Sequence, residues 1–364
     1  MKSNYNQLGQ YIEMVSRTNS DLKYGIEDVR GCSNTKQMMQ TRANLIGRTY
    51  EKFIVLRPQE FVFNRRTTRN GEKIGMAYNN TDREYIFTND YVAFRVKQEY
   101  LDKLLPDYLY MFFCRDEFDR YARYKSTGSA TEFFNWEDMC AVPFEIPPMD
   151  FQQLVVNAYK VLNERIETKQ KINDNLEAQA EAIYNEMIAN NSTNGTMSTL
   201  GEISTIKTGK LNSEAAVING IYPFFTCSQE TYRTNTFSFD QEAVLLAGNN
   251  ASAIYPLKIY CGKFDVYQRT YVISSNNRFV SNKQLYFVLK QQLNEFKGIS
   301  SGTTTKFLTM KILTPIPVVI APEDIATSFI NITNKIFETI FQNQREIEHL
   351  RELQMIVLGE LSRD

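Results

Sequence analysis

Apolar residues recur at intervals of three and four in two long stretches of the chain, and this period predicts a helix in each. In residues 150–190 the expected apolar face consists of Leu154, Ala158, Val161, Ile172, Leu176, Ile183 and Met187. In residues 323–364 it consists of Phe329, Ile332, Ile336, Ile340, Ile347, Leu350, Val357 and Leu361. At about 1.5 Å per residue, each helix would be about 55 Å long. One apolar stripe of that length needs a partner, so we expect an antiparallel coiled coil between the two helices.

The stretch that leads into each helix occurs twice with a constant offset. Gly128 matches Gly302 and Pro143 matches Pro317, both 174 residues apart (302 − 128), and the register continues into the helices. A fixed offset over about sixty residues indicates a duplication. Each copy reads as a small-residue loop, a short buried strand that ends at proline, and a helix whose first turn an aspartate can cap. Those aspartates are Asp150 and Asp324.

Lys169 and Asn343 interrupt the two apolar faces at equivalent places. One interpretation is a solvated gap in an imperfect seam. The other is a polar position that fixes the register of the two helices. The sequence leaves both open.

Two globular segments precede the helices, and they open alike. Leu8-Gly9 matches Leu200-Gly201 with an offset of 192 (200 − 8), so the first segment carries about 18 extra residues (192 − 174) before Pro106. We divide the chain into a first domain (1–149), a helix (150–190), a flexible linker (191–198), a second domain (199–322) and a second helix (323–364). Residues 15–47 give no clear period, and we expect mixed helix and loop there.

Alternating and short apolar runs predict the strands of both domains. In the first domain these runs are 53–56, 61–63, 85–87 and 91–96, with a helix from Pro106. In the second they are 222–226, 243–247, 258–260 and 270–274, with a helix through Leu285 and Leu289. Tyr222, Phe224 and Phe225 read as core aromatics, with base stacking as the alternative. The predicted fold is α/β (α+β): two duplicated mixed domains joined by two long helices.

Composition favours a cytoplasmic protein of 364 residues with ample length for two cores. No apolar run approaches the length of a membrane span, and residues 1–7 lack the apolar core of a signal peptide. The five cysteines are widely spaced, so we expect them reduced and mostly buried. His349 is the only histidine, which disfavours a metal site.

The net charge of −1 hides two basic segments. Residues 41–75 carry eight Lys and Arg against three Glu, and residues 251–311 carry nine against two acidic residues. The two helical stretches are acidic and cancel this charge. Two separate positive surfaces suit two contacts with a polyanion, although lysine-rich surfaces also occur in proteins that bind none.

Catalytic motifs are missing from the chain. It has no Gly-x-Gly, no phosphate-binding P-loop and no Asn/Asp-Pro-Pro-Tyr/Phe motif, and a nuclease-like Glu295-Phe-Lys297 triplet falls at the end of an expected helix. We therefore expect no activity from this chain itself.

The arrangement resembles the specificity subunit of type I restriction-modification systems. The resemblance rests on Leu-Gly-Glu-Ile at a domain start, Tyr-Pro-Phe-Phe-Thr-Cys (222–227), Ser-Gly-Thr-Thr-Thr-Lys (301–306) and Ile-Pro-Val-Val-Ile-Ala-Pro (316–322). It implies two target recognition domains that each read half of a bipartite duplex DNA sequence, with the helices as spacer. It also implies two modification (methyltransferase) subunits as partners, restriction (motor-nuclease) subunits as further possible ones, and no membrane. S-adenosylmethionine, ATP and Mg would be bound by those partners, with no cofactor in this chain. The competing hypotheses are a coiled-coil interaction scaffold with two binding modules and, less favoured, a nuclease.

Arginine can bridge guanine O6 and N7, asparagine can bridge adenine N6 and N7, and lysine mainly meets phosphate. The residues expected to contact DNA are therefore basic or amide side chains of the variable loops and polar residues of the repeated loops. In the first domain they are Arg65, Arg66, Thr67, Arg69, Lys125, Ser126 and Thr127. In the second they are Lys210, Asn249, Asn250, Lys263, Arg269, Ser301, Thr303 and Lys306.

Overall fold

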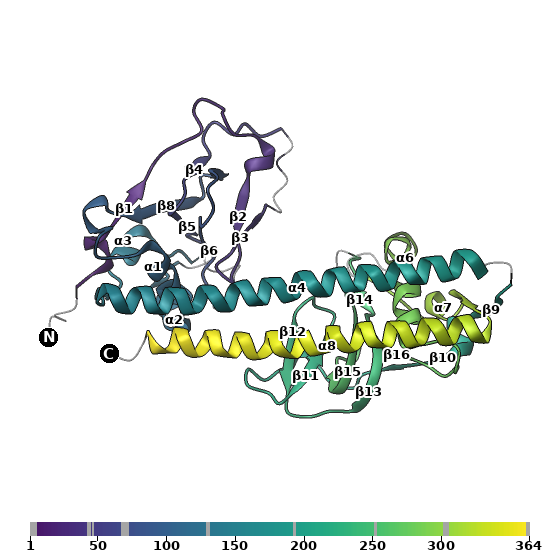
Figure 1. The fold of residues 1–364 in the computed structure, drawn as a ribbon. Helices are drawn as coiled ribbons and strands as arrows, with labels where there is room; N and C mark the ends of the chain where they lie inside the picture. Colours follow the sequence, from purple (N-terminus) through teal and green to yellow (C-terminus); the bar gives the residue numbers. More distant parts are fainter. Residues whose placement is uncertain are drawn as a thin grey trace. The chain divides into compact units, whose positions relative to one another are not determined.

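The structure is a computed structural model, and it describes residues 6–41, 45, 47–66, 73–128, 132–191, 194–250, 253–300 and 306–361. The chain forms two compact units. Unit 1 contains residues 1–165 and 349–364, and unit 2 contains residues 166–348. Each unit therefore takes one globular segment together with its own portion of both long helices (Figure 1).

Unit 1 is built on a four-stranded antiparallel sheet in the order β1-β8-β5-β6. These strands are β1 (Ile12–Val15), β8 (Tyr91–Val96), β5 (Phe61–Asn64) and β6 (Met76–Tyr78). One face packs on three helices, α1 (Pro106–Phe113), α2 (Asp116–Lys125) and α3 (Trp136–Cys140). Its core is aromatic because Phe61, Phe94 and Phe113 are fully buried against one another.

The other face of this sheet is covered by two short antiparallel pairs. They are β2 (Arg30–Cys32) with β3 (Met38–Gln40), and β4 (Ile54–Leu56) with β7 (Tyr85–Phe87). Three 3-10 turns, η1 (Leu8–Gln10), η2 (Ile26–Asp28) and η3 (Gln98–Tyr100), complete the unit. The expectation of helix and loop over residues 15–47 was wrong in part, because β2 and β3 lie there. Each of these two strands has only three residues, which is too few to show a period, and each forms because it pairs with the other.

Unit 2 has a six-stranded sheet in the order β10-β16-β13-β15-β11-β12. The strands are β10 (Ser204–Thr208), β16 (Thr270–Ser275), β13 (Phe239–Ala247), β15 (Leu257–Val266), β11 (Tyr222–Phe225) and β12 (Thr231–Thr234). Helix α6 (Asn282–Ile299) packs on β13, β15 and β16. Its N-terminus is capped by Ser281, whose hydroxyl accepts from the Gln284 amide at 3.2 Å. Phe224 and Phe225 are buried, which confirms them as core aromatics.

Smaller elements close unit 2 at its edges. They are β9 (Thr196–Thr199) paired with β18 (Pro317–Ile320), β14 (Asn249–Asn250) paired with β17 (Lys306–Phe307), α5 (Leu200–Ile203), α7 (Met310–Leu313) and η4 (Ser213–Ala215). β9 begins inside the stretch that we expected to be a flexible linker.

The predicted duplication is confirmed by strand pairing. Ile12 faces Val96 in unit 1, and Ser204 faces Ser275 in unit 2. Likewise Phe61 faces Phe94, and Val244 faces Ile273. The order β1-β8-β5-β6 thus recurs as β10-β16-β13-β15. The offset between equivalent strands falls from 192 (204 − 12) through 183 (244 − 61) to 179 (275 − 96), so the extra residues of the first domain are spread over several loops.

The repeat is incomplete in one place. We expected a short strand at residues 142–148, equivalent to β18, and this expectation was wrong. The segment makes only one bridge, Gln7 with Pro143, flanked by backbone hydrogen bonds from Leu8 to Val142 (2.9 Å) and from Phe144 to Asn6 (2.9 Å). Prolines 147 and 148 lack the amide donors that would extend the pairing.

The long helices are α4 (Met149–Asn191) and α8 (Glu323–Glu360). They run antiparallel in both units: Lys169 contacts Asn343 in unit 2, and Val155 packs on Leu358 in unit 1. Asp150 and Asp324 lie within the first turns, where a carboxylate favours the helix N-terminus, rather than at the cap itself.

The apolar face that we predicted for α4 was wrong in its first half. Leu154, Val161 and Ile172 are exposed, whereas Val155 and Ile166 are buried. From Ala326 to Leu350 the buried positions of α8 recur three and four residues apart, as a coiled-coil seam requires. In α8 the buried residues are Ala326, Phe329, Thr333, Phe337, Ile340, Asn343, Ile347, Leu350 and Leu358. In α4 this spacing holds only near the two ends, because the buried residues are Gln152, Val155, Ile166, Ala180, Tyr184, Met187 and Asn191. Ile332, which we also placed on the seam, is exposed.

The cysteines are free, but they are less buried than expected. Four are half-buried and Cys261 is exposed. Burial nevertheless raises the pKa of the Cys114 thiol to about 11 and raises that of Cys32, which disfavours the reactive thiolate at both. Among the described residues, no helix is long and apolar enough to cross a membrane.

Candidate nucleic-acid interface

In unit 1, the repeated loop contacts the end of the central strand β5. The backbone of Arg66 pairs with that of Phe133, and Phe133 pairs with Thr127. The amide of Phe134 donates to the carbonyl of Arg65 at 2.9 Å. Two residues expected at the interface, Arg65 and Arg66, therefore lie beside a third, Thr127, and all three are exposed.

Lys125 and Ser126 complete this group at the end of α2. The Ser126 hydroxyl donates to the Ala122 carbonyl at 2.7 Å, so it closes the helix. The Lys125 ammonium lies 5.8 Å from the Tyr121 ring. Thr67 and Arg69 lie outside the described residues.

The start of β6, which follows the Arg66 loop in sequence, is held by a buried ion pair. Lys36 and Asp119 are in direct contact, and their side chains are only 3% and 7% exposed. Lys36 donates to the Ile74 carbonyl at 2.9 Å, and the Ile74 amide donates to Asp119 at 3.0 Å. Burial lowers the pKa of Lys36 and raises that of Asp119, so each charge depends on the other.

In unit 2, the corresponding site lies where β13 ends. Asn249 pairs with Phe307 and Asn250 with Lys306, through β14 and β17. The amide of Leu308 donates to the carbonyl of Gly248 at 2.9 Å. The structure thus brings together Asn249, Asn250 and Lys306, three of the residues that we expected to contact DNA. The contact with DNA stays a prediction. Ser301 and Thr303 lie outside the described residues.

Arg269 also reaches this group. Its carbonyl accepts from the Gly248 amide at 2.8 Å, and its guanidinium lies 5.2 Å from the Phe307 ring. Lys263 and Lys210 are placed elsewhere. Lys263 is on β15 with its ammonium 4.7 Å from the Phe237 ring, and Lys210 lies exposed in the loop after β10.

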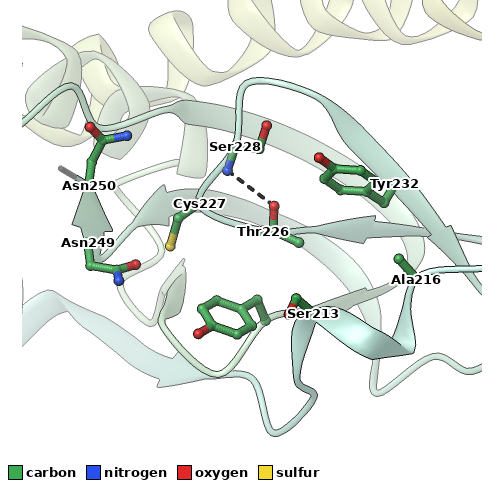
Figure 2. A pocket seen from close by; sticks show the side chains of 9 residues that line it. Ser213, Ala216, Thr226, Cys227, Ser228, Tyr232, Asn249 and Asn250 are labelled. Carbon is green, nitrogen blue, oxygen red and sulfur yellow. Dashed lines mark hydrogen bonds between the residues drawn. The ribbon is translucent and has the colours of Figure 1, made fainter. Parts of the chain in front are cut away.

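A hollow of about 490 Å³ lies beside the two asparagines (Figure 2). Its lining is uncharged and mostly polar or aromatic: Ser213, Ala216, Thr226, Cys227, Ser228, Tyr232, Asn249, Asn250 and Tyr267. The hydroxyl of Thr226 accepts from the Ser228 amide at 3.1 Å, which orders the turn between β11 and β12. Uncharged donors and acceptors with cations nearby suit contact with base edges and phosphates of DNA.

Lys258 stabilises the turn between β11 and β12 through two hydrogen bonds. Its ammonium donates to the Gln229 carbonyl at 2.7 Å and to the Thr231 hydroxyl at 2.9 Å. Burial lowers the pKa of Lys258 to about 8. Sequence reasoning did not identify Thr226, Ser228, Tyr267 or Lys258. The only signal available was a Thr-Cys-Ser run that begins at the last residue of a predicted strand, and nothing local linked it to residues 249–250.

The chain is similar to known proteins in its sequence and in its fold. The family model for the type I restriction modification DNA specificity domain matches twice, over residues 33–178 and 194–356. The specificity subunit of the type I restriction enzyme EcoDI from Escherichia coli is 39% identical over 119 residues. That match covers 33% of this chain and 26% of the relative, so it spans about a quarter of the relative's length.

Two further similarities extend over more of the chain. The MjaIX specificity subunit of Methanocaldococcus jannaschii is 22% identical over 298 residues, which is 71% of this chain and 69% of that protein. The crystal structure of a type I S subunit from M. genitalium shares the fold with a TM-score of 0.53 at 14% identity, covering 99% of this chain and 97% of that one. From the two family matches, the chain belongs to the family of the type I restriction modification DNA specificity domain.

Proposed function

We propose that each unit reads one half of a bipartite duplex DNA sequence and that the paired helices hold the two half-sites at a fixed separation. One observation carries the proposal: the same strand-and-loop frame occurs in both units, yet it presents different side chains where the repeated loop meets the central strand. A common frame with different polar side chains suits two readers of different sequences. A scaffold without DNA specificity would need no such difference.

The cations around each frame support contact with a polyanion. Arg65 and Arg66 are exposed in unit 1, and Arg269 and Lys306 flank the hollow in unit 2. If they meet phosphates, log of the binding constant should fall linearly with log of the salt concentration, by about 0.9 for each neutralised phosphate. Binding to duplex DNA that is insensitive to salt would favour the scaffold alternative.

The catalytic work would then belong to partners of this chain. We propose that two modification subunits dock on the helices and flanking surfaces, that they bring S-adenosylmethionine, and that restriction subunits with ATP and Mg can join them. Exposed apolar residues on the helices in unit 1, Leu154, Val161 and Ile356, support a partner surface there. Their duplicates 174 positions away include Ser328 and Lys335, so two copies would not meet identical side chains. Native mass spectrometry with the modification subunit encoded next to this chain should show two partners per chain. A complex that remains one-to-one at saturation would contradict the docking of two modification subunits.

Exchange of one domain tests the modular reading. Replacing residues 1–149 with the first domain of another family member should change one half of the recognised sequence and leave the other half intact. Inserting two helical turns after Leu176 in α4, with a matching insertion in α8, should keep both half-sites and alter the spacing between them. Methylome sequencing of cells that carry the chain with its modification subunit reports both results. A domain exchange that altered both halves together would refute independent reading.

A further inference from the structure

Arg66 in unit 1 and Asn249 in unit 2 occupy equivalent positions, and strand pairing shows this. Phe61 and Val244 are equivalent because each is the residue of the central strand that faces the matching residue of β8 or β16. Continuing at the same offset of 183 (244 − 61), Asn64 corresponds to Ala247, Arg65 to Gly248 and Arg66 to Asn249. The extension is continuous, because Asn64 still faces Tyr91 and Ala247 faces Thr270.

The repeated loop confirms this correspondence independently. It has its own offset of 174, which matches Phe133 with Phe307. Arg66 pairs with Phe133, and Asn249 pairs with Phe307. The Phe134 amide donates to the Arg65 carbonyl, and in the same way the Leu308 amide donates to the Gly248 carbonyl, at 2.9 Å in each case. Two unrelated offsets therefore assign the same pair of positions.

The residue on the adjacent strand side, beside Arg66 in unit 1 and Asn249 in unit 2, also differs between the units. At the offset of the β8 and β16 pair, 179 (270 − 91), Asp90 corresponds to Arg269. In unit 1 the Arg66 guanidinium lies 3.5 Å from the Asp90 carboxylate. In unit 2 Asn249 lines the hollow, and Arg269 is held against the Phe307 ring. Each pair of equivalent positions thus carries one arginine, Arg66 on the central strand side in unit 1 and Arg269 on the neighbouring strand side in unit 2.

Neither side chain is needed to hold the frame. The frame is held by backbone hydrogen bonds, and the Arg66–Asp90 pair is 45% and 56% exposed, so it contributes little to stability. The two side chains are instead those that make bidentate contacts to purines in the major groove, arginine to guanine and asparagine to adenine. A carboxylate beside the guanidinium also limits its rotation, which suits a fork that must meet one base edge.

We infer that Arg66 and Asn249 are paired specificity-determining positions, at which unit 1 reads a guanine and unit 2 reads an adenine. This inference rests on the proposed function, since it assigns a role within DNA reading. It goes further by naming one equivalent residue in each unit and the base class that each recognises. Asp90 contacts the Arg66 guanidinium, and the Arg269 carbonyl accepts from the amide of Gly248, the residue before Asn249.

The test exchanges the two side chains in the full chain, expressed with its modification subunit. In Arg66→Asn we expect one guanine of one half-site to lose its preference by about 5- to 150-fold, the range that corresponds to one bidentate base contact. In Asn249→Arg we expect the same loss at one adenine of the other half-site. Arg66→Lys keeps the charge but not the fork, so it should relax the same guanine while DNA binding at low salt is retained.

Two controls carry the same chemical changes at exposed helix positions. They are Arg120→Asn on α2 and Asn294→Arg on α6, and both should leave the methylated motif unchanged. If the wild-type chain yields a bipartite motif but the exchanges alter no single base, or alter both half-sites, the inference is wrong and the proposed function stands. If the wild-type chain directs no bipartite methylation, the proposed function fails, and the inference fails with it.

Discussion

The polar cluster in the helical seam of unit 2 leads to a specific prediction about coupling. Lys169 donates to Asn343 at 3.0 Å and lies 2.7 Å from Glu346, while Asn343 donates to Asn173 at 2.8 Å. Lys169 and Asn343 are 174 residues apart, so each contacts its own duplicate. Asn343 is only 9% exposed. The solvated-gap interpretation is therefore wrong, and we expect these groups to stabilise the seam cooperatively.

The magnitudes follow from the bonds that each change removes. Asn343→Ala deletes two partly buried hydrogen bonds at about 0.5–1.5 kcal/mol each, so the segment should lose roughly 1–3 kcal/mol. In Lys169→Met with Asn343→Leu, the buried polar groups are replaced by apolar ones. Because the desolvation cost disappears with them, the double variant should be about as stable as the wild type or more stable. The coupling between Lys169→Met and Asn343→Leu should be about 1–3 kcal/mol.

Hydrogen exchange followed by mass spectrometry measures this segment by segment. Peptides from residues 166–191 and 323–348 report the opening free energy of the helices in unit 2, separately from unit 1. Lys171→Met, at an exposed neighbouring position of α4, is the matched control and should change the opening free energy by less than about 0.5 kcal/mol. Additivity of the two single changes within about 0.5 kcal/mol would show that the seam residues act independently, which would refute the reasoning.

Two further predictions concern buried charges. Asp119→Asn should destabilise the chain by about 3–5 kcal/mol, because it leaves Lys36 buried without a counter-charge. The double variant Lys36→Met with Asp119→Leu should cost much less, because it removes both charges. A thermal melt in which Asp119→Asn had the melting temperature of the wild type would contradict this. Burial lowers the pKa of Lys258 to about 8 in the folded chain, against 10.5 when unfolded, so between these values the unfolded chain binds more protons and stability rises with pH. The melting temperature of the wild type relative to Lys258→Met should therefore increase from pH 7.5 to pH 10, while the exposed Lys207→Met should show no such trend.

The sequence by itself determined the parts of this protein that depend on local pattern. The sequence predicted the 174-residue repeat, the strands at 61–63 and 91–96, α1 from Pro106 and the long helices, and the structure has β5 over Phe61–Asn64. A period of two or of three to four persists in the letters because one face of each element is buried, whatever that face contacts. The repeat is visible because both copies preserve the same spacing.

Only the tertiary structure decided which residues meet. The seam of α4 includes Val155 rather than Leu154, because Met111 of α1 and Leu358 of α8 pack on that side, and a shift of one residue is about 100° around a helix. The contact of Lys36 with Asp119, the hold of Lys258 on its turn and the equivalence of Arg66 with Asn249 join residues far apart in sequence. No local period encodes them, because they depend on how helices pack on the sheet and on strand register, and register is set by the packing of a whole sheet.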